Sequence, residues 1–150
     1  MYTTFLFIHS WLRWIILALF LFTIIKSFMG MSGNKEYGKG DNALAASMVG
    51  TLHLQALIGL LLYFVLSPIT INAFGGDVSP MKDAGIRYWA VEHIFMMIVA
   101  VVVAQIGRSK AKKKTESAAK FKTQAIYFTI ALVLILSRIP WGDAERLFRF

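Results

Sequence analysis

The amino-acid sequence predicts an all-α membrane protein, a single domain whose four transmembrane helices form an up-down bundle with both termini on the outer side. Of the 150 residues, 57% are apolar and only 16% are charged, which lies outside the usual range of soluble domains. Four apolar stretches are each long enough to cross about 30 Å of hydrocarbon, which takes roughly 20 residues. Because these stretches occupy most of the sequence, it has no room for a soluble catalytic domain.

The predicted spans cover residues 4–27, 43–67, 80–108 and 120–139. The first is longer than a signal-peptide core of about 7 to 15 residues and no small-residue cleavage pattern follows it, so we expect it to be retained. Asp41 or Asn42 can cap the second span, and Pro68 follows its end. Ser79 and Pro80 are a typical N-cap and first-turn pair, which places the start of the third span. The fourth span follows a lysine-rich loop.

Basic residues set the predicted orientation. The loop between the third and fourth spans carries Arg108, Lys110, Lys112, Lys113, Lys114, Lys120 and Lys122. Short loops rich in Lys and Arg stay in the cytoplasm, so this loop is predicted to be cytoplasmic and both termini to lie outside. Trp and Tyr residues gather near the opposite ends of the spans, as expected of an interfacial belt. We interpret the lysines as a topology signal that also attracts anionic lipid, in preference to a nucleic-acid site.

Ionisable residues inside the predicted spans are the first candidates for function. His9, Arg13, His53, Glu92 and His93 all lie in or near apolar helices, and these include every histidine of the chain. An ionisable group in a membrane helix costs a few kcal/mol on insertion scales, so such residues are usually functional. The concentration of imidazoles in hydrocarbon therefore requires a chemical reason.

Metal ligation is the chemistry that buried imidazoles serve most often. The chain has no cysteine, which rules out thiolate nucleophiles, iron–sulfur clusters and covalently attached c-type haem. A b-type haem needs only two axial histidines from two helices. Zinc is a weaker interpretation, because Glu92 and His93 are adjacent and point about 100° apart on a helix. A proton relay is weaker still, because the inner halves of the spans offer almost no residue to continue it.

The sequence leaves two histidine pairings open. In an up-down bundle the first and third helices are diagonal, and a flat macrocycle fits between them better than between neighbours about 8–10 Å apart. We therefore place His9 with His93 first and His53 with His93 second. The remaining histidine could serve a second site, bind a quinone or be an ordinary core residue. Gly50 lies on a small-residue face near His53, where either a haem or another helix could approach closely.

Three arginines are candidates for the haem propionates, because the guanidinium group binds carboxylates bidentately. Arg13 follows His9 by four residues and so shares its helix face, whereas Arg87 and Arg138 are equally well explained as interfacial side chains. Glu92 is expected to pair with one of these arginines, which would lower the cost of burying both charges.

Four segments of the chain resemble a known family. They are His9-Ser10-Trp11-Leu12-Arg13-Trp14, Leu52-His53-Leu54-Gln55 with the later Ser67-Pro68, Arg87-Tyr88-Trp89-Ala90-Val91-Glu92-His93, and Arg138-Ile139-Pro140-Trp141. Together they are similar to the small bacterial four-helix membrane proteins labelled "cytochrome B", and more distantly to one half of haem A synthase. The resemblance implies four helices, a non-covalently bound b-type haem and a location in the bacterial inner membrane.

The resulting hypothesis is a membrane cytochrome that carries single electrons through haem b, with a quinone as a further cofactor or exchange partner. Two axial histidines leave no open iron position, which favours electron transfer over an enzyme with its own substrate. Other membrane redox proteins or a second copy of the chain are the expected partners. Two alternatives stay open: a cofactor-free structural subunit of a larger complex, and a membrane enzyme that modifies a quinol or haem.

Overall fold

The computed structural model describes residues 1–76 and 79–149, and within these ranges all regular secondary structure is helical. The elements are α1 (Tyr2–Ser32), α2 (Lys39–Leu61), η1 (Leu62–Leu66), α3 (Pro68–Ala73), α4 (Ala84–Arg87), η2 (Tyr88–His93), α5 (Ile94–Lys113), α6 (Ser117–Ser137) and α7 (Ala144–Leu147). Four continuous helical segments are long and apolar enough to cross a membrane: Tyr2–Ser32, Lys39–Leu66, Ala84–Lys113 and Ser117–Ser137. They indicate a multi-pass membrane protein.

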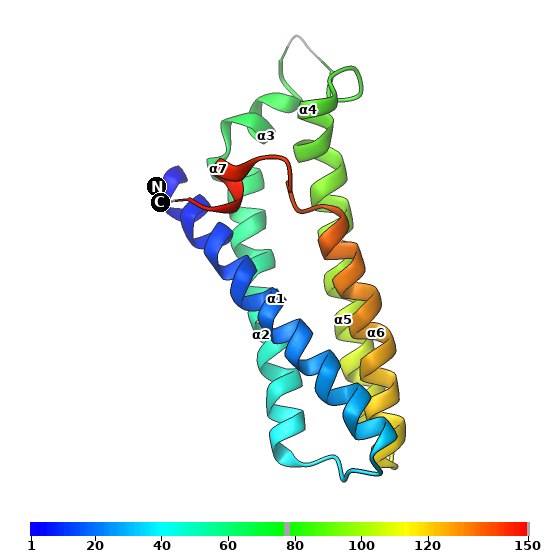
Figure 1. The fold of residues 1–150 in the computed structure, drawn as a ribbon. Helices are drawn as coiled ribbons and strands as arrows, with labels where there is room; N and C mark the ends of the chain where they lie inside the picture. The colour runs from blue at the N-terminus through cyan, green and yellow to red at the C-terminus, as the bar shows by residue number, and fades with distance from the viewer. Residues whose placement is uncertain (77–78, 150) are drawn as a thin grey trace.

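The four long helices lie side by side along the length of the molecule (Figure 1). Helix α1 packs against α2 and α6, and α5 packs against the same two helices, so α1 and α5 occupy opposite corners. Figure 1 shows the α1–α2 and α5–α6 connections at one end and both chain termini near the other. We call these the basic end and the terminal end of the molecule.

The second helix begins at Lys39, four residues before the predicted start at 43, and its cap differs from the prediction. Asp41 is the third residue of the helix, and its Oδ2 accepts a hydrogen bond of 3.0 Å from the backbone N–H of Gly38. Asp41 therefore closes a capping box from inside the first turn. Its Oδ1 also pairs with Lys26 Nζ of α1 at 3.0 Å, which ties the first two helices together.

The third long helix begins at Ala84, so the predicted start at residue 80 is wrong. Asp83 is the N-cap, and its Oδ1 accepts a 2.8 Å hydrogen bond from Ile86 N. Ser79 instead opens a turn in which the N–H of Lys82 donates to the carbonyl of Ser79. Asp and Ser are both good caps, and the structure uses the acidic side chain four residues further along.

The other helix ends also differ from the predicted ones. Helix α1 continues to Ser32 and α5 to Lys113, five residues beyond the predicted ends at 27 and 108. Helix α6 spans Ser117–Ser137 in place of 120–139. Hydrophobicity marks only the part of a helix that suits lipid, so polar turns that continue the same helix are not detected.

Two π-helical turns, η1 and η2, lie opposite each other near the terminal end. The hydroxyl of Tyr63 in η1 donates a 2.7 Å hydrogen bond to the carbonyl of Ala90 in η2. The carbonyl of Tyr63 in turn accepts a 2.7 Å hydrogen bond from Thr70 Oγ1 of α3. Such turns are rare and often mark functional sites. Here the second π turn ends at His93 and so sets the direction of that side chain.

Packing is tight in the half of the molecule near the basic end. Phe20 of α1 and Phe128 of α6 are fully buried, with ring centroids 6.3 Å apart in an edge-to-face arrangement. A Cβ added at Gly30 would come within 2.5 Å of the buried Phe121 ring, and one added at Gly107 would collide with Tyr127. Small residues thus allow α1 and α5 to approach α6 closely, as is common between membrane helices.

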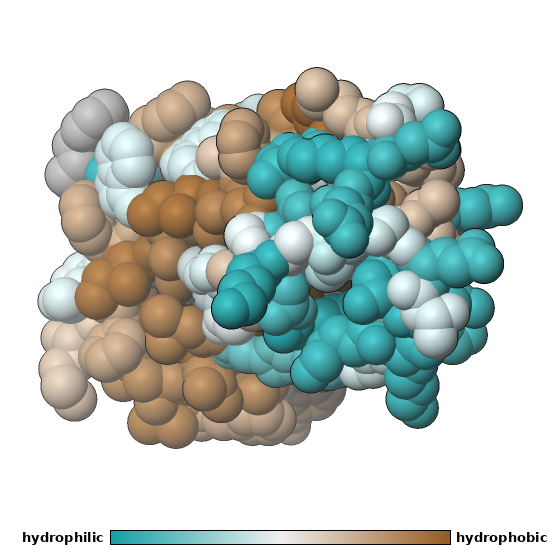
Figure 2. Space-filling model, turned by 90° about the horizontal axis from the view of Figure 1, so that it is seen from below, coloured by the Kyte–Doolittle hydropathy of each residue, from teal (hydrophilic) through white to brown (hydrophobic). Residues whose placement is uncertain are grey.

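The basic end carries exposed lysines on both of its connections. Figure 2, viewed from this end, shows hydrophilic residues gathered over one side of the face and apolar residues on the other. Lys110 Nζ donates to Tyr127 Oη at 2.8 Å and lies 5.3 Å from the centre of that ring. The two lysine-containing connections therefore lie together at one end of the fold, as the sequence predicts.

Candidate functional site

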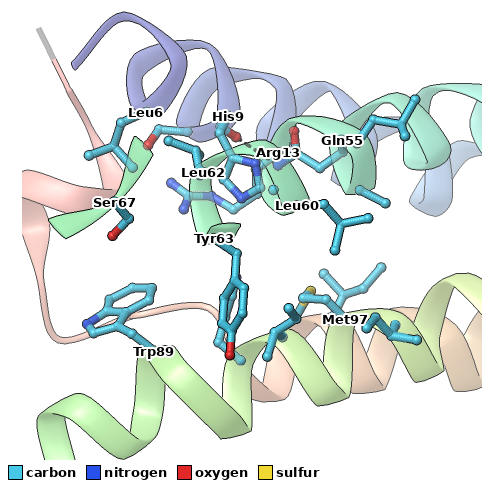
Figure 3. Close-up of a pocket in the computed structure, with 18 of the residues that line it drawn as sticks. Leu6, His9, Arg13, Gln55, Leu60, Leu62, Tyr63, Ser67, Trp89 and Met97 are labelled. Carbon is cyan, nitrogen blue, oxygen red and sulfur yellow. Dashed lines mark hydrogen bonds between the residues drawn. The ribbon is translucent and has the colours of Figure 1, made fainter. Parts of the chain in front are cut away.

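A cavity of about 560 Å³ opens between α1, α2 and α5 in the terminal half of the molecule. This volume is within the roughly 300–1,000 Å³ of typical ligand sites. Figure 3 shows His9 and Arg13 pointing from α1 into this space, Trp89 and Met97 on the opposite wall, and Tyr63 reaching across between them. The wall is mainly apolar, and its polar residues include His9, Arg13, His53, Gln55, Tyr63, His93, Arg146 and Arg149.

All three histidines line this one cavity, and two of them lie at a similar height. At 1.5 Å per residue, His93 lies about 30 Å from the basic end of α5 and His9 about 35 Å from that of α1. Because α1 is inclined in Figure 1, the height of His9 above the basic end is smaller than this length along the helix. His53 lies only about 21 Å from the start of α2.

The ring of His93 is fixed by the end of α6. Its Nδ1 lies 3.0 Å from the carbonyl oxygen of Arg138, and the hydroxyl of Tyr88 donates to the same oxygen at 2.8 Å. A carbonyl can only accept, so Nδ1 carries the proton and neutral His93 keeps its lone pair on Nε2. The Trp89 ring packs 5.4 Å from the imidazole. His93 therefore has the orientation and tautomer that suit a metal ligand.

His53 has the same tautomer from a different partner. Its Nδ1 lies 2.7 Å from the carbonyl of Val49, one turn earlier in α2. The lone pair of neutral His53 is therefore on Nε2 as well. Unlike His9 and His93, the residue is exposed, although it also lines the cavity.

His9 lies between α1 and α2 with an unsatisfied nitrogen. Its Nδ1 is buried and has no hydrogen-bond partner among the described residues. Gly59 faces the ring so closely that an added Cβ would lie 3.2 Å from His9 Cε1. Gln55 Nε2 donates a 2.8 Å hydrogen bond to the carbonyl of His9, whereas Gln55 Oε1 is buried without a partner in the described chain. An unpaired buried ring nitrogen is costly, so it suggests a missing ligand.

The chain folds back over the terminal end of the cavity as a C-terminal strap, residues 143–149. Arg13 Nη2 donates to the carbonyls of Arg146 and Leu147 at 3.2 and 2.9 Å. Trp14 Nε1 donates to Leu147 O at 3.0 Å, and Trp11 Nε1 donates to the carbonyl of Arg149 at 2.7 Å. Three donors of α1 thus hold the strap in place.

Two arginines of the strap, Arg146 and Arg149, also line the cavity. Neither was a candidate from the sequence. Arg146 pairs with Asp143 at 2.9 Å, and its guanidinium lies 4.5 Å from the centre of the Trp89 ring. The Nε atoms of Arg13 and Arg149 are buried and have no acceptor among the described residues. Buried cationic groups with free donors are suited to an anionic ligand.

Arg87, Arg138 and Gly50 were candidates from the sequence, and none of them lines this cavity. Arg87 and Arg138 both bind Glu92, at 2.9 and 3.2 Å, so the expected ion pair of Glu92 involves two arginines. Gly50 is exposed, and an added Cβ would meet no atom within 4 Å. No close helix approach depends on Gly50.

The tail and the π turns are the parts of the site that sequence reasoning missed. The segment after Asp143 has mixed charge and aromatic residues, which fits an interfacial segment as well as a strap. No pattern in the sequence indicates a π turn at Tyr63. The phenylalanine of the strap, Phe148, stacks on Trp14 at 5.3 Å and 8°, a contact between distant parts of the sequence.

Comparison of the chain with protein-family models, with curated proteins and with solved structures gives no match. The resemblance to four-helix "cytochrome B" proteins therefore stays a prediction. In the described part of the chain, no three His, Cys, Asp or Glu side chains come together as a metal site. The absence of such a three-residue cluster does not bear on haem, because haem iron takes at most two axial ligands from the protein.

Proposed function

We propose that this protein is a b-type cytochrome of the bacterial inner membrane, which binds one haem between His9 and His93 and carries single electrons. The observation that supports this most is that two half-buried imidazoles line one apolar cavity at similar height, on helices at opposite corners of the molecule. Both lie at the end of the cavity where the arginines gather.

In this proposal the four long helices cross the membrane in an up-down bundle, with the basic end in the cytoplasm. The lysines of the α1–α2 and α5–α6 connections favour that orientation because basic loops are retained inside. The chain termini, the strap and the haem then belong to the outer half of the membrane. Their position would suit electron exchange with a partner on that side.

The residues around the cavity fit a haem in three respects. The wall is largely apolar, as the macrocycle requires. The guanidinium groups of Arg13 and Arg149, which line the cavity, would supply donors for two carboxylates. The His9 ring and the free Nε2 of His93 would supply imidazole ligands to the iron, because both residues line the cavity.

Bound haem would supply an iron centre that takes up and releases one electron, and the chain determines how that centre is held. The carbonyl of Arg138 orients His93, and Gly59 leaves the space that the His9 ring occupies. Arg13 and the strap cover the terminal end and limit the entry of water. Because His9 and His93 would both hold the iron, electron transfer is favoured over reaction with a small substrate.

Haem content of histidine variants tests the proposal. We expect the purified wild-type protein to show a Soret band with sharp α and β bands on reduction, and His9→Ala and His93→Ala to lose it. His53→Ala and the control Leu54→Ala, an exposed residue of the same helix, should retain haem. A colourless wild-type protein from haem-replete cells would favour the cofactor-free subunit, and loss of haem only in His53→Ala and His93→Ala would favour the second pairing.

A further inference from the structure

Beside the histidine pair, the cavity has an opening between α2 and α5 in the middle of the molecule. Leu57 of α2 and Ile98 and Val102 of α5 line the cavity and are still 65%, 49% and 49% exposed. Along α5, Ile98 and Val102 lie about 22 and 16 Å from the basic end. His53, about 21 Å from the start of α2, lies between these two heights. The opening is therefore apolar, with His53 beside it.

In a membrane this opening faces lipid and not water. It lies well inside helices whose apolar windows span the hydrocarbon, far from the lysines of the basic end. A ligand that enters here must dissolve in the bilayer, and most of the surface it meets is aliphatic. Free lipid chains meet the first requirement, but they have no group that could bond to an imidazole.

His53 is the polar group at this opening, and its tautomer defines what it can bind. Because Nδ1 donates to the carbonyl of Val49, the Nε2 atom of the neutral ring can only accept a hydrogen bond. A polar nitrogen in hydrocarbon without a partner is unfavourable. The best occupant is therefore a lipid-soluble molecule that carries a hydroxyl donor on a compact head.

We propose that the opening between α2 and α5 is a quinol site, in which a hydroxyl of the quinol head donates to His53 Nε2 and the prenyl tail leaves between the helices into lipid. This inference rests on the proposed function, because it treats His53 as free of iron. The acceptor-only nitrogen selects the reduced quinol, which has two O–H donors, over the quinone, which has none. The site lies about 10 Å nearer to the basic end than the histidine pair.

Binding of two probes with the same ring, one with hydroxyl donors and one without, tests the site. The probes are a short-chain benzoquinol and its dimethyl ether, titrated into chemically reduced protein in lipid nanodiscs, with binding followed by calorimetry. One hydrogen bond in an apolar site should make the quinol bind about tenfold tighter than the ether. His53→Leu should abolish this preference, His53→Gln should restore part of it through its amide oxygen, and Leu54→Ala should leave it unchanged. Val102→Trp should weaken both probes by filling the opening.

Haem content, measured on the same samples, separates this inference from the proposed function. Equal binding of the two probes, or a preference that survives in His53→Leu, would overturn the quinol site. Loss of haem in His53→Leu would also overturn it, since His53 would then be an iron ligand. If the protein never contains haem but still prefers the quinol to the ether in a way that depends on His53, the quinol site would be supported and the proposed cytochrome function would be contradicted.

Discussion

The two halves of this molecule are built differently, although the same four helices run through both. Near the basic end, α1, α5 and α6 pack through glycine, alanine and phenylalanine, and residues such as Phe20 and Ala104 are fully buried. Near the terminal end, the helices separate around a cavity that contains three histidines and is bounded by two π turns. The first half provides close packing, and the second provides space and unpaired polar atoms.

This difference indicates a division between stability and function. Membrane helices associate through van der Waals packing, because lipid chains satisfy apolar side chains as well as protein does. The closely packed half therefore contributes most of the association energy. Replacing residues of the cavity half should cost little stability and should change ligand binding, and the following substitutions test that expectation in order of decreasing effect.

Phe20→Ala should be the most destabilising of these substitutions. The ring is fully buried against Phe128, so its removal leaves a cavity between α1 and α6. We expect a loss of about 3 kcal/mol in unfolding free energy, near the low end for soluble cores because the transfer term is largely absent in lipid. Leu57→Ala, in the cavity wall, should cost less than about 0.5 kcal/mol. Unfolding in mixed micelles by circular dichroism measures both, and equal losses would contradict the division.

Gly30→Ala should have the next largest effect, with Gly50→Ala as its matched control. The new methyl group at position 30 would lie 2.5 Å from the ring of Phe121, which is buried and cannot move aside. Overpacking of this kind costs about 2 kcal/mol. At Gly50 nothing lies within 4 Å, so the gain in helix propensity should leave that variant neutral or slightly more stable. The same unfolding measurement applies, and a destabilised Gly50→Ala would refute the assignment of open space there.

Trp14→Ala should loosen the strap without unfolding the helices. It removes the indole N–H donated to Leu147 O and the ring that stacks on Phe148. One hydrogen bond and one aromatic contact amount to about 1.5 kcal/mol, or roughly tenfold faster hydrogen exchange at the amides of Leu147 and Phe148. Trp14→Phe keeps the stacking and should give about half of that free-energy change. Equal rates in both variants would mean that the stacking contributes nothing.

How much of the structure the sequence predicts depends on how far apart along the chain the interacting residues lie. The four spans and the position of the histidines followed from hydrophobicity and residue type, which act along the chain. The strap depends on contacts between residues more than 130 positions apart, such as Arg13 with Leu147, and no local sequence pattern predicts such contacts. Arg146 and Arg149 were therefore missed. Arg87 and Arg138 were selected from the sequence, but in the structure both pair with Glu92.

The smallest expected effect concerns Tyr88, which shares an acceptor with His93. Both donate to the carbonyl oxygen of Arg138, so each hydrogen bond weakens the other. In Tyr88→Phe the oxygen accepts from His93 Nδ1 alone, and that bond should strengthen by a few tenths of a kcal/mol. A stronger bond at Nδ1 makes the imidazole a better electron donor through Nε2.

If His93 binds the haem iron, the better donor ligand stabilises the oxidised state. The midpoint potential of Tyr88→Phe should then fall by about 10–20 mV, since 59 mV corresponds to a tenfold change for one electron. Potentiometric titration of the Soret band measures it, with Tyr63→Phe as a control that keeps both bonds to Arg138 but loses the one to Ala90. A rise in potential, or an equal fall in the control, would mean that the carbonyl of Arg138 does not tune the ligand, and the cavity would then affect the iron only through its shape and charge.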